Sequence, residues 1–320
     1  MSELIHLIRS ARDLRARGEP FAYATVVAVR GSSYRRPGAR MILTADRWVA
    51  GSVSGGCLEG DLVRKLRWHL RGGRPVVLTF DATDGRLGCN GAVDVLLEEA
   101  SGDERDPLVV AERCVREQKR VAIVTTICGD AIGSRVMCSA GVCAEADADH
   151  FVEAIVPPPR LFVLGASHDA LPLVRTAAGV GWETFVCVST ARVATRERFM
   201  DACDAILSVD EAAQGIEASD TPLAVVMSHD FDADARSLAM LLRSRAGYIG
   251  VLGPRERTER LLAEIGAVDD RRIFSPIGLD LGADGPDEIA LAIVAEARAS
   301  LARSSRRSLR DRTPKRVEVA

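Results

Sequence analysis

The stretch Pro157-Pro-Pro-Arg-Leu-Phe-Val-Leu-Gly-Ala-Ser-His-Asp-Ala170 decides the fold of this chain. Three successive prolines cannot continue a helix or a central strand, so they predict a domain boundary at about residue 157. The apolar run after them predicts a short buried strand, and Gly165 predicts a tight turn into a helix. We therefore expect one domain over residues 1–156, a second over 157–302, and a tail over 303–320.

The second domain alternates short apolar runs with helical segments. Strands are expected at 160–165, 184–189, 204–208, 222–228 and 247–252, and helices at 169–180, 231–244, 255–265 and 286–302. Strands that alternate with helices are typical of a doubly wound parallel sheet. The sequence therefore predicts a Rossmann-like domain of the α/β class.

The first domain mixes its elements without strict alternation. Runs rich in Val, Ile and Thr predict strands at 21–29, 39–43, 76–80, 92–98 and 120–127, and helices are expected at 2–17, 57–71 and 107–118. Leucines at fourfold spacing give the 57–71 helix one apolar stripe. This pattern predicts an N-terminal α+β domain.

Charge and hydropathy exclude several classes of protein. The 320 residues carry 42 Lys and Arg against 45 Asp and Glu, a net charge of −3. A protein whose main task is to hold nucleic acid needs a dense cationic surface, so nucleic acid is not an expected partner. The chain has no run of about 18 apolar residues and no secretory signal pattern, so we expect no membrane association and a cytoplasmic location. The basic tail over 303–320 is expected to be disordered.

The loop Gly51-Ser-Val-Ser-Gly-Gly-Cys57 is the most informative segment of the first domain. Glycine-rich loops can aim several N–H groups at one anion, and Ser54, Gly55 and Gly56 supply such groups here. The helix that follows carries partial positive charge at its start, which would stabilise a thiolate at Cys57. Upstream, the guanidinium groups of three arginines could fork onto phosphate oxygens: Arg35, Arg36 and Arg40.

A second cysteine stands in a glycine-rich turn, Gly88-Cys89-Asn90-Gly91, 32 residues after Cys57. A soft thiolate at Cys57 or Cys89 suits a soft metal or an electrophile. From local sequence alone, both cysteines fit equally well as small buried side chains in tight turns. A zinc site is disfavoured, because the sequence has no CxxC pair and no Cys/His cluster near these cysteines.

The turn Gly165–Ala170 partly matches the dinucleotide-binding pattern G-x-G-x-x-G/A. Ser167 replaces the second glycine, and Ser189 stands where the ribose-binding acid is expected. Candidate ligand-facing residues at the carboxyl edge of the predicted sheet are Gly165, Ser167, His168, His229, Asp230 and Arg255. His168 could instead be a partly exposed cover of the loop, and Asp230 could cap the helix that follows.

These motifs together resemble the XdhC/CoxI family, the accessory proteins of xanthine dehydrogenase and related molybdenum hydroxylases. The resemblance covers most of residues 15–300. It is carried in the first domain by Gly31-Ser-Ser33, Arg35-Arg-Pro-Gly-Ala-Arg40, Gly51-Ser-Val-Ser-Gly-Gly-Cys57-Leu-Glu-Gly60 and Gly88-Cys-Asn-Gly91, and in the second by Ser228-His-Asp230, Tyr248-Ile-Gly-Val-Leu-Gly-Pro-Arg255 and Pro276-Ile-Gly-Leu-Asp-Leu-Gly282. The family's usual Gly-Ala-Gly-His-Val-Gly becomes Gly165-Ala-Ser-His-Asp-Ala170, which weakens a dinucleotide role.

The resemblance implies a chaperone rather than a turnover enzyme. It would bind molybdenum cofactor (molybdopterin), protect it while a sulfido ligand is installed, and hand it to the apo-form of a molybdenum hydroxylase. Implied partners are that hydroxylase and a cysteine desulfurase, and a homodimer is the default assembly. Two alternatives remain open: an NAD(P)-linked oxidoreductase with a reactive Cys57, and a protein–protein adaptor that binds neither pterin nor nucleotide.

Overall fold

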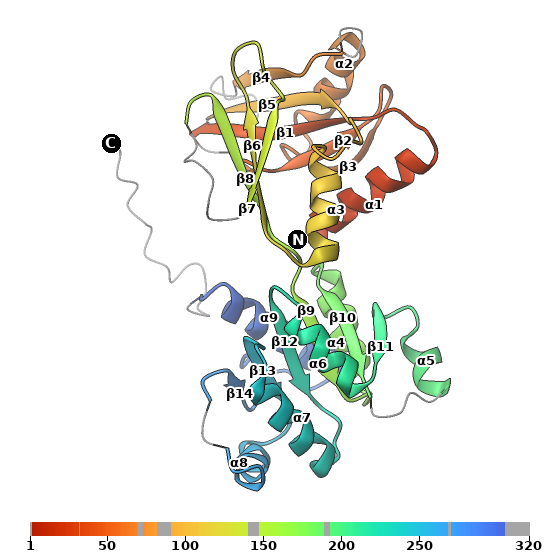
Figure 1. The fold of residues 1–320 in the computed structure, drawn as a ribbon, viewed down its shortest axis with the longest axis vertical. Helices are drawn as coiled ribbons and strands as arrows, with labels where there is room; N and C mark the ends of the chain where they lie inside the picture. The colour runs from red at the N-terminus through yellow and green to blue at the C-terminus, as the bar shows by residue number, and fades with distance from the viewer. Residues whose placement is uncertain are drawn as a thin grey trace. The chain divides into compact units, whose positions relative to one another are not determined.

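The computed structural model describes residues 2–31, 33–69, 73–81, 91–139, 147–188, 193–267 and 270–304. The protein divides into two compact units, residues 1–157 and 158–320, and most contacts between residues lie within one unit (Figure 1). Within the described part of the chain, no helix is both long enough and apolar enough to cross a membrane.

The first unit is built around a five-stranded antiparallel sheet of order β3-β2-β1-β5-β4. Its strands are β1 (Ala22–Gly31), β2 (Arg40–Leu43), β3 (Trp48–Gly51), β4 (Val76–Asp81) and β5 (Gly91–Glu99). Three further strands, β6 (Val121–Thr126), β7 (Arg135–Ser139) and β8 (His150–Ile155), form a second antiparallel sheet of order β7-β6-β8. The antiparallel pairing agrees with the α+β class expected from the mixed pattern.

Three helices cover these sheets: α1 (Ser2–Ala16), α2 (Glu59–His69) and α3 (Pro107–Glu117). The leucines of the predicted stripe pack into one core, where Leu58 of the preceding loop and Leu62 and Leu66 of α2 meet side chains of β1, β2 and β5. The helices α1 and α3 pack together in a second core that contains Leu14 and Leu108. Asp106 caps α3, since its carboxylate accepts the N–H groups of Leu108 and Val109.

The second unit is a six-stranded parallel sheet of order β11-β10-β9-β12-β13-β14. Its strands are β9 (Arg160–Leu164), β10 (Glu183–Cys187), β11 (Ala205–Leu207), β12 (Pro222–Val226), β13 (Tyr248–Val251) and β14 (Ile273–Phe274). Counted from β9, this is the strand order 3-2-1-4-5-6 of the Rossmann fold. The predicted fold class is therefore confirmed.

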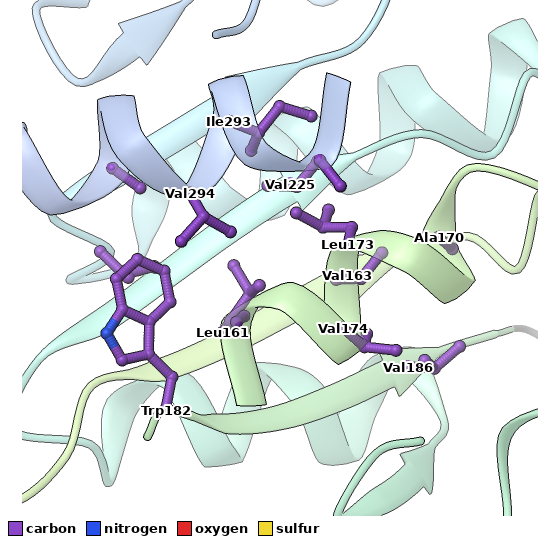
Figure 2. Close-up of a cluster of buried hydrophobic side chains, with 14 of the residues drawn as sticks. Leu161, Val163, Ala170, Leu173, Val174, Trp182, Val186, Val225, Ile293 and Val294 are labelled. Atoms are coloured by element: carbon purple, nitrogen blue, oxygen red, sulfur yellow. The ribbon is translucent and has the colours of Figure 1, made fainter. Parts of the chain in front are cut away.

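Helices cover both faces of this sheet: α4 (Ala170–Gly179), α5 (Val193–Phe199), α6 (Val209–Glu217), α7 (Phe231–Arg243), α8 (Arg255–Glu264) and α9 (Pro286–Leu301). Leu161 and Val163 of β9 point to one face, where Figure 2 shows them among side chains of α4 and α9. Phe162 and Leu164 point to the opposite face, toward α6, α7 and α8. Alternate residues of one strand thus enter two cores, which explains why the strand is apolar throughout.

Six elements lie outside the segments that the sequence predicted: β3, β7, β8, β14, α5 and α6. The strands β3 and β14 have four and two residues, too few to show a period. The helix α6 carries a recognisable start signal, because Ser208 and Glu211 form a complete capping box. The helix predicted at 57–71 begins at Glu59 instead, so Cys57 lies in the loop before it.

Candidate functional site

The loop before α2 is organised around its own glutamate. Oε1 of Glu59 accepts hydrogen bonds from the Val53 and Ser54 N–H groups at 3.0 and 2.9 Å. Oε2 accepts the Gly56 and Leu58 N–H groups at 2.9 and 3.1 Å. The hydroxyl groups of Ser52 and Ser54 donate to the same carboxylate. The loop's N–H groups were expected to bind an anionic ligand, but in this conformation a carboxylate of the chain itself accepts them.

This carboxylate is charged under all ordinary conditions. Glu59 is only 1% exposed, and burial by itself would raise the pKa of its side chain. Hydrogen bonds from the hydroxyls of Ser54 and Ser52 and from backbone N–H groups outweigh burial and lower that pKa to about 2. The loop is therefore held by a full negative charge that water does not reach.

Cys57 is an exposed, free thiol at this loop. The alternative of a small buried side chain is therefore wrong for Cys57. The two residues before it both have positive φ, 86° at Gly55 and 123° at Gly56, a conformation that favours glycine. A Cβ atom on Gly55 would lie 3.0 Å from two ring atoms of Tyr34, whereas one on Gly56 would meet open space. Beside the thiol, the Tyr34 ring therefore covers the backbone of Gly55, whereas the backbone of Gly56 is open.

Two of the three candidate arginines are held by carboxylates. Arg35 donates to both carboxylate oxygens of Glu3, at 2.7 and 3.1 Å. Arg40 is 4% exposed and donates to Thr25 at 2.9 Å and to Glu153 at 2.8 Å. In this conformation the guanidinium groups of Arg35 and Arg40 donate to side chains of the same chain. They are therefore not arranged to bind a phosphate, the role that the sequence predicted for them. Arg36 is exposed, and within the described residues it makes no ion pair.

A cavity of about 260 Å³ lies beside the buried arginine of the first unit. Its lining includes Gly38, Ala39 and Arg40 from one loop and strand, together with Glu3 of α1 and Glu153 of β8. Cys57 does not line this cavity. Two other candidate site residues, Cys89 and Asn90, lie outside the described residues, as does Ser189 of the second unit. The described residues contain no cluster of three His, Cys, Asp or Glu side chains that could hold a metal ion.

In the second unit, the strand order reverses between β9 and β12, and the ends of these strands lie in close contact. Gly165 has φ 126°, and a Cβ atom there would lie 2.7 Å from the Met227 carbonyl oxygen and from the Ser228 nitrogen. Only glycine fits this approach. Ligands of open α/β sheets bind outside such a reversal, at the carboxyl ends of the strands.

Several predicted residues gather at this reversal. His229 has a left-handed backbone, φ 64°, and its Nε2 lies 3.8 Å from Oδ2 of Asp169 at the head of α4. Arg198 donates to the Ser167 carbonyl oxygen at 3.0 Å and so covers the turn. The hydroxyl oxygen of Ser167 is buried without a hydrogen-bond partner. His168 is exposed at the same turn.

Asp230 and Arg255 lie at the starts of helices. Asp230 caps α7 by accepting the Ala233 N–H group at 2.8 Å, which confirms the capping alternative. Arg255 is the exposed first residue of α8. The structure brings Gly165, Asp169 and His229 together. Asp230 and Arg255 lie after the ends of β12 and β13, where α7 and α8 begin.

Sequence reasoning missed Asp234, which is 1% exposed near the start of α7. Its Oδ1 accepts the Ser228 hydroxyl at 2.5 Å and the Ser228 N–H at 3.1 Å. Its Oδ2 accepts a hydrogen bond from Arg257 at 2.8 Å. An aspartate on a predicted amphipathic helix gives no signal of this kind, because the pattern alone assigns it to the solvent face.

Residues 14–81 match the family described as "XdhC and CoxI family", and residues 161–297 match the one described as "XdhC Rossmann domain". The chain belongs to the XdhC and CoxI family. The Cys57 loop lies inside the first matched range, and the strand reversal at Gly165 lies inside the second. Both candidate sites of this XdhC-family chain are therefore in segments that match the family models.

Three relatives agree with this assignment. A Bacillus subtilis protein named as a probable subunit of xanthine dehydrogenase is 29% identical over 87% of this chain and 92% of its own length. The "molybdenum cofactor insertion chaperone PaoD" of Escherichia coli is 23% identical over 91% of this chain and 86% of its own length. A crystal structure described as a xanthine dehydrogenase from Bacillus halodurans is 29% identical, with a TM-score of 0.77 over 97% of this chain and 98% of that one.

Proposed function

We propose that this chain acts in the maturation of a molybdenum hydroxylase, as a binding protein for molybdenum cofactor. In this role it protects the cofactor while the sulfido ligand is installed on molybdenum and then delivers it to the apo-hydroxylase. Membership of the XdhC and CoxI family supports this role, as does the similarity to a protein named for molybdenum cofactor insertion. The cofactor is cargo here and not a resident group.

The exposed thiol of Cys57 is the observation that carries the proposal. A thiolate is a soft ligand and suits the molybdenum of a dithiolene-bound cofactor. The nearby N–H groups of the loop already donate to Glu59, so the sulfur is the group left free to meet a ligand. Of the three candidate arginines, Arg35 and Arg40 already pair with carboxylates, so we expect the exposed Arg36 to be the one that meets the cofactor's phosphate.

Cofactor content of the purified protein tests this role. The chain is expressed with molybdate, and molybdenum and pterin are measured by elemental analysis and mass spectrometry. We expect cofactor to co-purify with the wild type and to be lost in Cys57→Ser. The matched control is Cys128→Ser, because Cys128 is also an exposed free thiol. Cofactor retention by Cys57→Ser equal to that of the control would remove the thiol from the site.

Delivery requires partner proteins. We propose that the chain forms a homodimer, receives sulfur from a cysteine desulfurase, and binds the apo-form of its hydroxylase. Reconstitution of an apo-hydroxylase with cofactor-loaded chain is the direct assay. Activation of the hydroxylase that depends on prior desulfurase treatment supports sulfuration on this chain. Equal activation by free cofactor would contradict delivery.

A second candidate is an NAD(P)-linked oxidoreductase. The observation that favours it is the strand order of the second unit, which is that of dinucleotide-binding proteins. The Asp169 carboxylate opposes it, because a negative charge at the head of α4 repels the pyrophosphate that the helix would otherwise attract. Calorimetric titration with NADPH separates the two roles, since saturable binding is required only by the oxidoreductase.

A further inference from the structure

We propose that Glu59 is the positioning residue of the Cys57 loop and that its carboxylate acts as a built-in anion. The carboxylate fills the space that an anionic ligand would use and holds the thiol outward. The loop then receives the cofactor at its metal end, through Cys57, and not at its phosphate. This inference rests on the proposed function and specifies the orientation of the cargo at that site.

The hydrogen bonds of the loop support the anion role. Both carboxylate oxygens of Glu59 are used, by four backbone N–H groups and two hydroxyl groups contributed by residues 52–58. Converging N–H groups before a helix are the usual receptor for a phosphate. A carboxylate fixed to the same chain is present at high effective concentration, so a free phosphate competes poorly for these donors.

The same contacts fix the residue that bears the thiol. Cys57 stands between Gly56 and Leu58, and the N–H groups of both neighbours donate to one oxygen, Oε2 of Glu59. The Leu58 side chain is 8% exposed and packs into the core below α2. With the backbone held on both sides and Leu58 directed inward, the Cys57 side chain is directed to solvent.

Removal of the carboxylate tests the inference with a readout that a general loss of structure would not give. Glu59→Ala empties the space between the donors, and formate is small enough to refill it. We expect the Tm of Glu59→Ala to rise saturably with formate relative to chloride at equal ionic strength. The wild type and Asp61→Ala are expected to show no such rise. Asp61 is a matched control because it is an acid of the same helical turn that pairs with Arg64 and Lys65 at the surface.

Cofactor retention tests the connection to Cys57. We expect retention by Glu59→Ala to fall about tenfold, the change that one lost hydrogen bond to a charged group produces, and formate to restore it. Glu59→Gln has the same shape, but backbone N–H groups face both ends of its amide, so in either orientation the N–H₂ group meets donors and the variant is expected to fail as well. Asp61→Ala is expected to retain cofactor at the wild-type level.

Each outcome has one meaning. Unchanged cofactor retention in both Glu59 variants, or a folded Glu59→Ala variant that does not respond to formate, would overturn the inference. If the wild type takes up no cofactor, the proposed function fails. The formate response of Glu59→Ala still decides whether the loop is built around its own anion.

Discussion

The ring of Tyr34 lies against the backbone of Gly55, two residues before the exposed thiol of Cys57. A Cβ atom at this position would lie only 3.0 Å from two atoms of the ring. The φ of Gly55 is 86°, a value that residues other than glycine rarely adopt. Both sterics and backbone conformation therefore require glycine here. The contact joins the loop at 33–38 to the loop at 52–58, which are far apart in the sequence.

Gly55→Ala is expected to destabilise the protein by about 1 kcal/mol or more, because the methyl group is strained by the positive φ and displaces the Tyr34 ring. Urea unfolding measures this loss. The control is Gly60→Ala, a helical glycine with no heavy atom within 4 Å of the added methyl group. It is expected to stabilise the protein by roughly 0.5–1 kcal/mol. Equal effects of the two substitutions would contradict the role given to Tyr34.

Arg40 and Arg36 are expected to separate stability from ligand binding. Arg40→Ala leaves Glu153 without its buried partner, so it is expected to cost about 3–5 kcal/mol of stability. Arg36→Ala removes an exposed charge and is expected to leave the Tm unchanged while it weakens cofactor retention. Thermal unfolding and molybdenum content are measured on both variants. A stable Arg40→Ala variant that loses cofactor would instead place Arg40 in the ligand site.

Stability should depend on the protonation of Glu59. Its folded-state pKa of about 2 lies below the ordinary value of 4.5, so its contribution is complete above pH 4.5 and is lost as the pH falls toward 2. A shift of this size corresponds to roughly 3 kcal/mol, at about 1.4 kcal/mol per pKa unit. The free energy of unfolding is measured from pH 7 to pH 2.5. Glu59→Gln should flatten the dependence below pH 4.5, and a slope equal to that of the wild type would disprove the assignment.

Asp234→Asn is expected to cost about 3–5 kcal/mol, because it leaves the Arg257 guanidinium without a charged partner beneath the strand ends. Asp232→Asn, on the exposed side of the same helix, should change stability by less than about 0.5 kcal/mol. Chemical unfolding of the two variants compares them directly. Similar losses in both would show that the buried contact is not what stabilises the start of α7.

The second unit was predictable from sequence because each of its central strands is a continuous apolar run between helices. Leu161 to Leu164 alternate between two cores, which explains why no polar residue interrupts them. The short edge strand β14 was not predictable, since two residues carry no period. In the first unit, β7 and β8 were not predicted as strands, because their sequences contain charged and polar residues: Arg135, His150 and Glu153. Arg135 pairs with Glu98, and Glu153 pairs with Arg40, so these charges are explained only by tertiary contacts.

The candidate site was predictable in its composition but not in its connections. Glycine content, Cys57 and the arginines could be identified from the motif, and the exposed thiol agrees with that interpretation. Which anion accepts the hydrogen bonds of the loop's N–H groups could not be predicted, because a ligand and Glu59 offer the same chemistry to them. The pairing of Arg35 with Glu3, across 32 residues, likewise depends on the fold.

Glu59, whose carboxylate accepts the N–H groups of the residues on both sides of Cys57, is the first residue of α2, and Leu62 and Leu66 of that helix are only 0% and 1% exposed. The position of the Cys57 sulfur therefore depends, through Glu59 and α2, on how the buried leucines of that helix pack. A tilt of α2 carries the carboxylate with it and moves the sulfur in turn. Substitutions deep inside the first unit can thus alter the geometry of a surface atom that they never touch.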